Sequence, residues 1–179
     1  MKTYFKKLFV SILARISVVP SINFKVGAKG VFLINSVQDW MNICEHIRLD
    51  KHYSDGKNFA LNADIVIESR DEGWLVFAGN LDGRDHTITL RGGLVEQPTV
   101  AIFRIGPGGV VSNVKFDGPY FSIYLNEGQI DNCSSTCPNK FVELNSPDGV
   151  IRDCTFLGDS AAVENRGTIE NCERIEQND

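Results

Sequence analysis

A short repeat in the second half of the chain constrains the fold more than any other feature. Its consensus is Gly-x-(Ile/Val)-x-(Asn/Asp)-(Cys/Val), and its copies are Gly109–Val114, Gly128–Cys133, Gly149–Cys154 and Gly167–Cys172. The copies start 19, 21 and 18 residues apart, and a second short apolar segment precedes each of them. Such a unit is too short for a helical repeat, and it matches one coil of a parallel β-solenoid.

Stacked coils place equivalent residues above one another at the interstrand spacing of about 4.8 Å. The repeat therefore predicts an aliphatic ladder inside, a cysteine ladder in which cysteine acts as a small hydrophobe, and an asparagine ladder at a turn. The members of these three ladders are Ile130, Ile151 and Ile169; Cys133, Cys154 and Cys172; and Asn126, Asn145 and Asn165.

The fold expected from this repeat is all-β, a right-handed, single-stranded parallel β-helix of about five or six coils. We expect one domain over residues 1–179, with the coils in 61–175 and a strand and a helix leading into them in 31–60. That short helix is predicted at 37–48, because Ser36 begins a capping box and apolar residues follow at helical spacing.

The first 30 residues are expected to form a cap segment. Residues 1–19 have a basic start and an apolar stretch, but Arg15 interrupts the stretch and no clean signal cleavage site follows. No run reaches the roughly 18 apolar residues of a membrane span. Read as a helix, the segment has one apolar face, so we expect an amphipathic helix covering the open end of the fold. A weak export signal and a helix in contact with a membrane surface remain the alternatives.

The cysteines are read as packing residues. Five is an odd number, and Cys133 and Cys137 have no second pair or nearby histidine to complete a zinc site. No metal and no cofactor is therefore predicted. Reduced cysteines favour a cytoplasmic location, with secretion or the cell surface as the alternative.

The charge is distributed unevenly along the chain. Residues 1–38 hold six basic and no acidic side chains, which leaves 12 basic and 23 acidic side chains in the remainder, a balance of −11. An acidic body disfavours nucleic acid, whose phosphates require lysine and arginine. It is compatible with a basic protein partner.

Two segments of the first half carry a family resemblance. Phe59–Ile67 reads F-A-L-N-A-D-I-V-I, and Phe77–Leu90 contains L-D-G-R-D-H-T-I-T-L; the Gly-x-Ile-x-Asn repeats then follow. Over roughly residues 31–172 this order resembles the GLUG-type β-helix repeats of bacterial surface proteins, adhesins among them. Ala101-Ile-Phe103 departs from that family's Gly-Leu-Phe. The resemblance implies a repeated scaffold with adhesive or spacer roles and no catalytic residues.

Candidate contact residues lie in the repeats. We expect Tyr120, Phe121 and Tyr124 to be exposed aromatic residues along one face. Asp117, Asp131 and Asp153 could line one face, although Asn also occurs at such repeat positions, as expected of solvated turns. These six are the candidate partner-binding residues. The oligomeric state stays open.

His86 is the residue that a catalytic hypothesis would choose, but its setting, Asp-Gly-x-x-His-Thr-Ile, is typical of a tight turn entering a strand. The sequence therefore favours a non-catalytic, adhesin-like scaffold that presents a surface to a protein, or to a glycan. The alternatives are an intracellular interaction or inhibitor protein using an acidic face, and an enzyme acting on polysaccharides.

Overall fold

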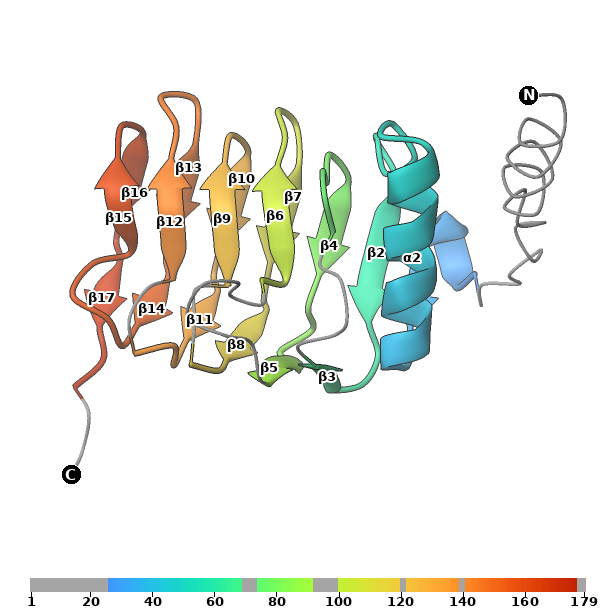
Figure 1. The fold of residues 1–179 in the computed structure, drawn as a ribbon, viewed down its shortest axis with the longest axis horizontal. Coiled ribbons are helices and arrows are strands. Elements are labelled where there is room, and N and C mark those ends of the chain that lie inside the picture. The colour runs from blue at the N-terminus through green and yellow to red at the C-terminus, as the bar shows by residue number, and fades with distance from the viewer. Residues whose placement is uncertain (1–25, 69–73, 92–99, 120–121, 139–140, 177–179) are drawn as a thin grey trace, which may run out of the picture.

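The protein winds into a parallel β-solenoid. The structure, a computed structural model, describes residues 26–68, 74–91, 100–119, 122–138 and 141–176. These residues form about five coils stacked along the long axis of the molecule (Figure 1). From residue 80 to residue 165 each coil passes through three sheets, and the named strands pair in parallel with those of the coils before and after. The predicted all-β, parallel β-helix is confirmed.

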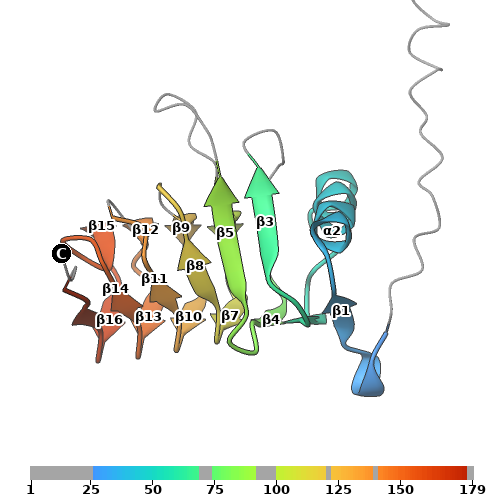
Figure 2. The same cartoon turned by 90° about the horizontal axis from the view of Figure 1, so that it is seen from below.

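Three sheets enclose the core, with sheet A along the lower side in Figure 2. Sheet A contains β1 (Phe32–Ile34), β2 (Asn58–Leu61), β4 (Asn80–Asp82), β7 (Val110–Ser112), β10 (Gln129–Asp131), β13 (Val150–Arg152) and β16 (Thr168–Glu170). Sheet B contains β3 (Ile65–Glu68), β5 (Thr87–Arg91), β8 (Lys115–Asp117), β11 (Ser134–Ser135), β14 (Thr155–Phe156) and β17 (Glu173–Arg174). Sheet C contains β6 (Ile102–Ile105), β9 (Ile123–Asn126), β12 (Val142–Asn145) and β15 (Ala162–Asn165).

The middle residue of each sheet A strand in the repeats occupies one ladder. Ile130 is in register with Val111 on one side and with Ile151 on the other, and all three are fully buried. Ile169 continues the same register beyond Ile151 but is 37% exposed, because it belongs to the last coil described. The alternation of buried and exposed positions along each short strand follows from the two-residue period of a β-strand.

A sharp bend joins sheet A to sheet B in each repeat, and it explains the Asn/Asp of the consensus. Asn113, Asn132, Asp153 and Asn171 have φ of 55°, 49°, 53° and 50°. Most L-residues lose roughly 1–2 kcal/mol in this left-handed region, whereas Asn and Asp adopt it more readily. The Asn132 side-chain amide also donates to Asn113 Oδ1 at 2.7 Å, so the bend residues of adjacent coils are linked.

Replacing Asn132 with valine is expected to destabilise the protein by roughly 1–2 kcal/mol, because a β-branched residue is strained at positive φ. Glycine at the same position removes the amide contact with Asn113 but relieves the backbone. We therefore expect a smaller loss for Asn132→Gly, measured by urea denaturation. Equal losses in the two variants would show that the side-chain hydrogen bond, not the backbone conformation, selects asparagine.

A second turn joins sheet C to sheet A, and a buried asparagine ladder supports it. Asn126 Nδ2 donates to Asn145 Oδ1, and Asn145 Nδ2 donates to Asn165 Oδ1, both at 2.8 Å. Asn126 and Asn145 are fully buried, while Asn165 is exposed in the last coil. The glycine that begins each repeat copy is required here: a Cβ on Gly149 would lie 2.5 Å from the Asn126 carbonyl oxygen.

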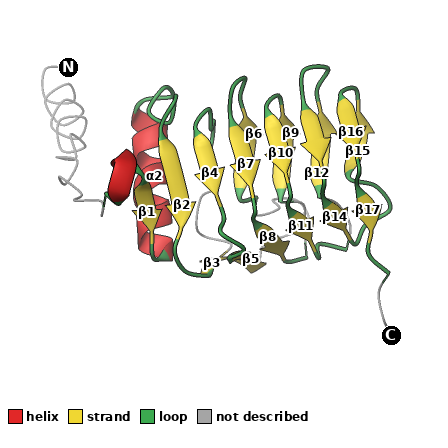
Figure 3. Cartoon of the chain, turned by 180° about the vertical axis from the view of Figure 1, so that it is seen from behind, coloured by secondary structure: helices red, strands yellow, loops and turns green. Residues whose placement is uncertain are grey.

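Helix α2 (Val37–Leu49) closes the N-terminal end of the core, as Figure 3 shows in red. It begins at Ser36, whose hydroxyl accepts from the Asp39 N–H at 3.2 Å, and this confirms the predicted helix at 37–48. Its Trp40 ring stacks on Trp74 with centroids 4.0 Å apart, and both indoles are fully buried.

Before β1, a short 3-10 helix, η1 (Ala28–Gly30), leads the chain into the solenoid. Val26 forms an antiparallel bridge to Phe32 across this turn, so a tight hairpin pairs with the first residue of β1. The amphipathic cap helix predicted within residues 1–19 lies outside the described residues.

Candidate functional site on sheet C

The outer surface of sheet C carries a column of exposed apolar side chains. The strand registers, with the bridges from Trp74 to Ile102 and from Phe77 to Ile105, align one outward position at five successive levels. These levels are occupied by Leu75, Phe103, Tyr124, Glu143 and Val163, which we call the sheet C column. At about 4.8 Å per level the column is roughly 19 Å long.

The apolar members of the column are well exposed. Leu75 and Phe103 are each 45% exposed, Tyr124 is 39% exposed and Val163 is 51% exposed. Burial of such side chains in a partner contributes about 25 cal/mol per Å² of apolar surface removed from water. Leu75, Phe103 and Tyr124 are consecutive, whereas Glu143 separates Val163 from them. A contiguous exposed apolar patch is typical of a protein-interaction surface.

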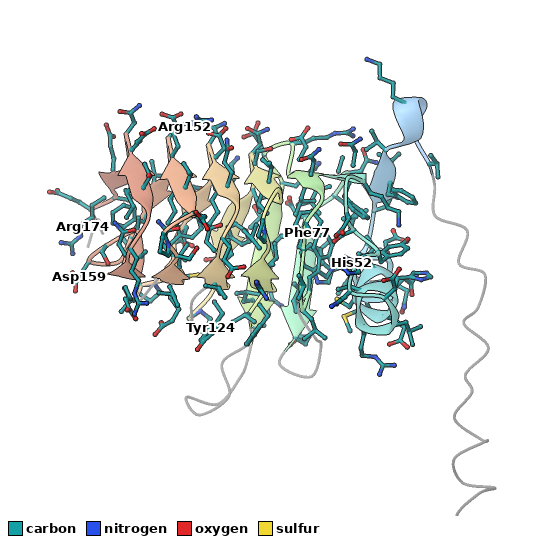
Figure 4. All side chains as sticks on the ribbon, turned by 90° about the horizontal axis from the view of Figure 1, so that it is seen from above. His52, Phe77, Tyr124, Arg152, Asp159 and Arg174 are labelled. Carbon is teal, nitrogen blue, oxygen red and sulfur yellow. The ribbon has the colours of Figure 1, made fainter. Side chains whose placement is uncertain are left out.

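Phe103 and Tyr124 form a stacked aromatic pair at the centre of the column. Their ring centroids are 4.8 Å apart and their planes differ by 15°. The stack follows from the parallel register, which places β6 directly beside β9. Tyr124 projects outward from the solenoid in Figure 4. The pair therefore forms a flat, preformed aromatic platform.

The residue that follows each aromatic member of the sheet C column is less exposed. After Phe103 this residue is Arg104, which forms an ion pair within the protein. Arg104 Nε donates to Glu127 Oε2 at 2.6 Å, so the charge on this side of Phe103 is already balanced within the protein. At the next levels Leu125 and Leu144 are half-buried. These leucines widen the apolar surface around Tyr124.

Only one of the three predicted aromatic contact residues can be placed. Tyr124 lies in the sheet C column, whereas Tyr120 and Phe121 lie outside the described residues. Leu75, Phe103 and Val163 belong to the same surface but were not predicted from the sequence. Glu143 was the available signal, because a charged residue at the matching place in one repeat copy indicates that this position faces water.

The three predicted acidic residues do not all lie on one sheet. Asp117 lies on sheet B, Asp131 lies on sheet A, and Asp153 is a bend residue at positive φ between these sheets. Arg152 Nη2 donates to Asp131 Oδ2 at 2.8 Å and lowers the pKa of that carboxyl. Arg152 Nε also lies 3.5 Å from Asp153 Oδ2, so Asp131 and Asp153 meet at one arginine, whereas Asp117 lies on another sheet.

His86 lies at the entrance to β5, where its ring nitrogen Nδ1 is 3.1 Å from Asp64 Oδ1. The Thr87 N–H donates to the same oxygen at 2.8 Å. These contacts, the Thr87 bond first, lower the pKa of the Asp64 carboxyl, whose side chain is 71% exposed. A general base working near neutral pH needs a raised carboxyl pKa. The contacts with Asp64 therefore hold the bend before β5 against the preceding coil.

The cysteines are free thiols built into the core. Cys133 and Cys154 are buried in successive coils, and Cys172 is half-buried in the last one. The adjacent Cys133 thiol and burial raise the pKa of Cys154, which keeps it protonated. Cys137 has a different neighbour, Ser122 Oγ at 3.4 Å, and burial raises its pKa as well. Protonated, buried thiols are poor nucleophiles and poor metal ligands.

A surface hollow of about 480 Å³ lies beside β17, near Arg174 and Asp159 in Figure 4. Arg174 Nη2 is 3.2 Å from Asp159 Oδ1, and both side chains are largely exposed. The other residues that line the hollow are Pro138, Leu157, Ile175 and Glu176, all exposed or half-buried. The lining offers no buried polar group to orient a small ligand, in contrast to the usual ligand pocket.

Comparison of the chain with protein-family models, with curated proteins and with solved structures found no match. In the part of the chain that the structure describes, no helix is long and apolar enough to cross a membrane.

Proposed function

We propose that this protein is a non-catalytic binding scaffold that presents sheet C to a protein partner. The observation that carries the proposal is the sheet C column, with the stacked Phe103–Tyr124 pair at its centre. Aromatic residues dominate the binding energy of many interfaces, because rigid rings bury a large area at little cost in conformational entropy.

The electrostatics support an apolar contact over an acidic one. Several acidic side chains are paired within the protein, including Glu127 with Arg104, Asp131 with Arg152 and Glu164 with Arg166. An inhibitor-like protein that docks through an acidic face would present unpaired carboxylates to its partner. The resemblance to GLUG-type repeats supports a binding module built on a repeated scaffold.

The test is a pull-down from a lysate of the native cell with a Phe103→Ser/Tyr124→Ser double variant. We expect the wild-type protein to capture one stoichiometric protein and the variant to bind it at least about 30-fold more weakly, since hot-spot residues contribute 2 kcal/mol or more. Both positions are exposed, so the melting temperature should change little.

Leu49→Ser is the matched control, because Leu49 is an exposed apolar residue on α2, away from sheet C. This variant should capture the partner as well as the wild type does. Undiminished capture by the double variant would contradict the proposed surface. Turnover of a polysaccharide that is abolished by His86→Ala would contradict the non-catalytic function itself.

A further inference from the structure

We propose that the partner bound by sheet C is a second copy of this chain, so that two sheet C columns pack against each other around a two-fold axis. This inference rests on the proposed function, because it names the partner of the same surface. Most homo-oligomers are closed by two-fold symmetry, in which one surface patch contacts the same patch of the other copy. Such a patch must be complementary to its own rotated image.

The sheet C column has five levels, and Tyr124 occupies the middle one. Phe103 and Glu143 lie one level away on opposite sides, and Leu75 and Val163 lie two levels away. Two sheets that pack face to face commonly keep their strands aligned. A two-fold axis that lies between the sheets, parallel to the strands and at the level of Tyr124, preserves this alignment and reverses the order of the levels.

This rotation brings apolar side chains together at three of the five levels. Tyr124 meets Tyr124 of the second copy on the axis, and Leu75 meets Val163 of the second copy at both outer levels. These three side chains are 39% to 51% exposed in the single chain, so their contact removes apolar surface from water. Leu125, half-buried beside Tyr124, extends the contact along the axis.

The two remaining levels bring opposite charges together. Phe103 faces Glu143 of the second copy, and Arg104, the next residue, reaches the same carboxylate. Arg104 also pairs with Glu127, but a guanidinium has five N–H donors and can bind a second carboxylate. The symmetry forms this contact twice, whereas a two-fold axis along the solenoid would place Glu143 against Glu143 of the second copy. Charge complementarity therefore selects the axis parallel to the strands.

The test is the mass of the purified chain in solution, measured by sedimentation equilibrium over a range of concentrations. We expect the mass of two chains for the wild type at the higher concentrations. Glu143→Arg should raise the dimer dissociation constant at least about 10-fold, because it brings two like charges together at two equivalent places. Adding Arg104→Glu to this variant exchanges the two charges and should restore most of the affinity.

Leu49→Arg is the matched control, because it adds the same charge on α2 and should leave the protein dimeric. The Phe103→Ser/Tyr124→Ser variant should be monomeric, since Tyr124 lies on the axis. Circular dichroism checks that each variant folds. A wild type that is monomeric throughout, a Glu143→Arg variant that remains dimeric, or a folded exchanged variant that does not recover would each overturn the proposal.

The result is separable from that of the proposed function. If the purified chain is monomeric and the Phe103→Ser/Tyr124→Ser variant loses a protein captured from the native cell, sheet C binds a different protein and only the second copy is wrong. If that variant changes neither the capture nor the mass in solution, sheet C is not the binding surface and both proposals are wrong.

Discussion

Replacing Trp74 with alanine is expected to lower the free energy of unfolding by about 3–5 kcal/mol, the usual loss when a buried tryptophan is truncated. Trp74 is fully buried and lies at the meeting point of α2 and the first coils. Its ring centroid is 4.0 Å from that of Trp40, 4.8 Å from that of Phe77 and 5.8 Å from that of Phe59. Its loss would leave a cavity between the helix and the coils.

Urea denaturation followed by tryptophan fluorescence and by circular dichroism measures this effect. Because coils of a solenoid contact mainly their neighbours, the N-terminal end should unfold first in the variant. Phe103→Ala is the matched control, since it removes an aromatic ring that is 45% exposed. We expect the control to lose much less stability. Similar losses in both variants would contradict the assignment of Trp74 to the core that joins α2 to the solenoid.

Replacing Asn145 with alanine is expected to cost roughly 3 kcal/mol, because each buried polar group left without its partner costs about 1–3 kcal/mol. Asn145 accepts from Asn126 Nδ2 and donates to Asn165 Oδ1. Its Nδ2 also lies 3.3 Å from the carbonyl oxygens of Gly149 and Thr168. One side chain thus links three consecutive coils at the turn between sheets C and A.

Asn165→Ala is the matched comparison, because it removes the same side chain at the exposed end of the ladder. Asn165 occupies the same position in the last coil, where water can replace the lost contacts. We expect a loss of about 1 kcal/mol or less for this variant, in line with a solvent-exposed hydrogen bond. Chemical denaturation of the two variants side by side gives the comparison. A larger loss for Asn165→Ala than for Asn145→Ala would show that the ladder does not stabilise the coils.

The repeat made the solenoid predictable from sequence. Glycine, Asn/Asp and the β-branched residue between them recur at fixed places, and each has a local cause that the structure shows. Gly149 has no room for a side chain, and Asn132 bends the backbone at positive φ. Such requirements act within one coil and its neighbours, so they appear in the sequence at the coil period.

The sheet C column was less accessible to sequence reasoning. Phe103 and Tyr124 follow inward-facing isoleucines in short apolar strands, so their own copies do not reveal which side faces water. Only alignment with Glu143 of the next coil identifies the outward position. The packing of the whole coil decides which side of a strand faces the core, and a segment of three or four residues does not encode this.

The positions of the acidic candidates within their coils were also not evident from the sequence. Asp131 and Asp153 belong to adjacent repeat copies, but Asp131 aligns with Arg152, and Asp153 aligns with the bend residue Asn132. Residue type alone grouped these carboxylates, whereas the structure places both of them beside Arg152. The same alignment would have placed Asp131 beside a compensating arginine.

Site-specific photo-crosslinking in the native cell tests the central claim most directly, namely that this protein binds a partner through sheet C. A benzoylphenylalanine would replace Tyr124 on sheet C, Arg152 on sheet A or Thr155 on sheet B, one at a time. We predict a crosslink to one discrete partner protein from position 124, and none from position 152 or 155. The absence of a crosslink at 124, or equal crosslinking from either of the other two sheets, would contradict the account.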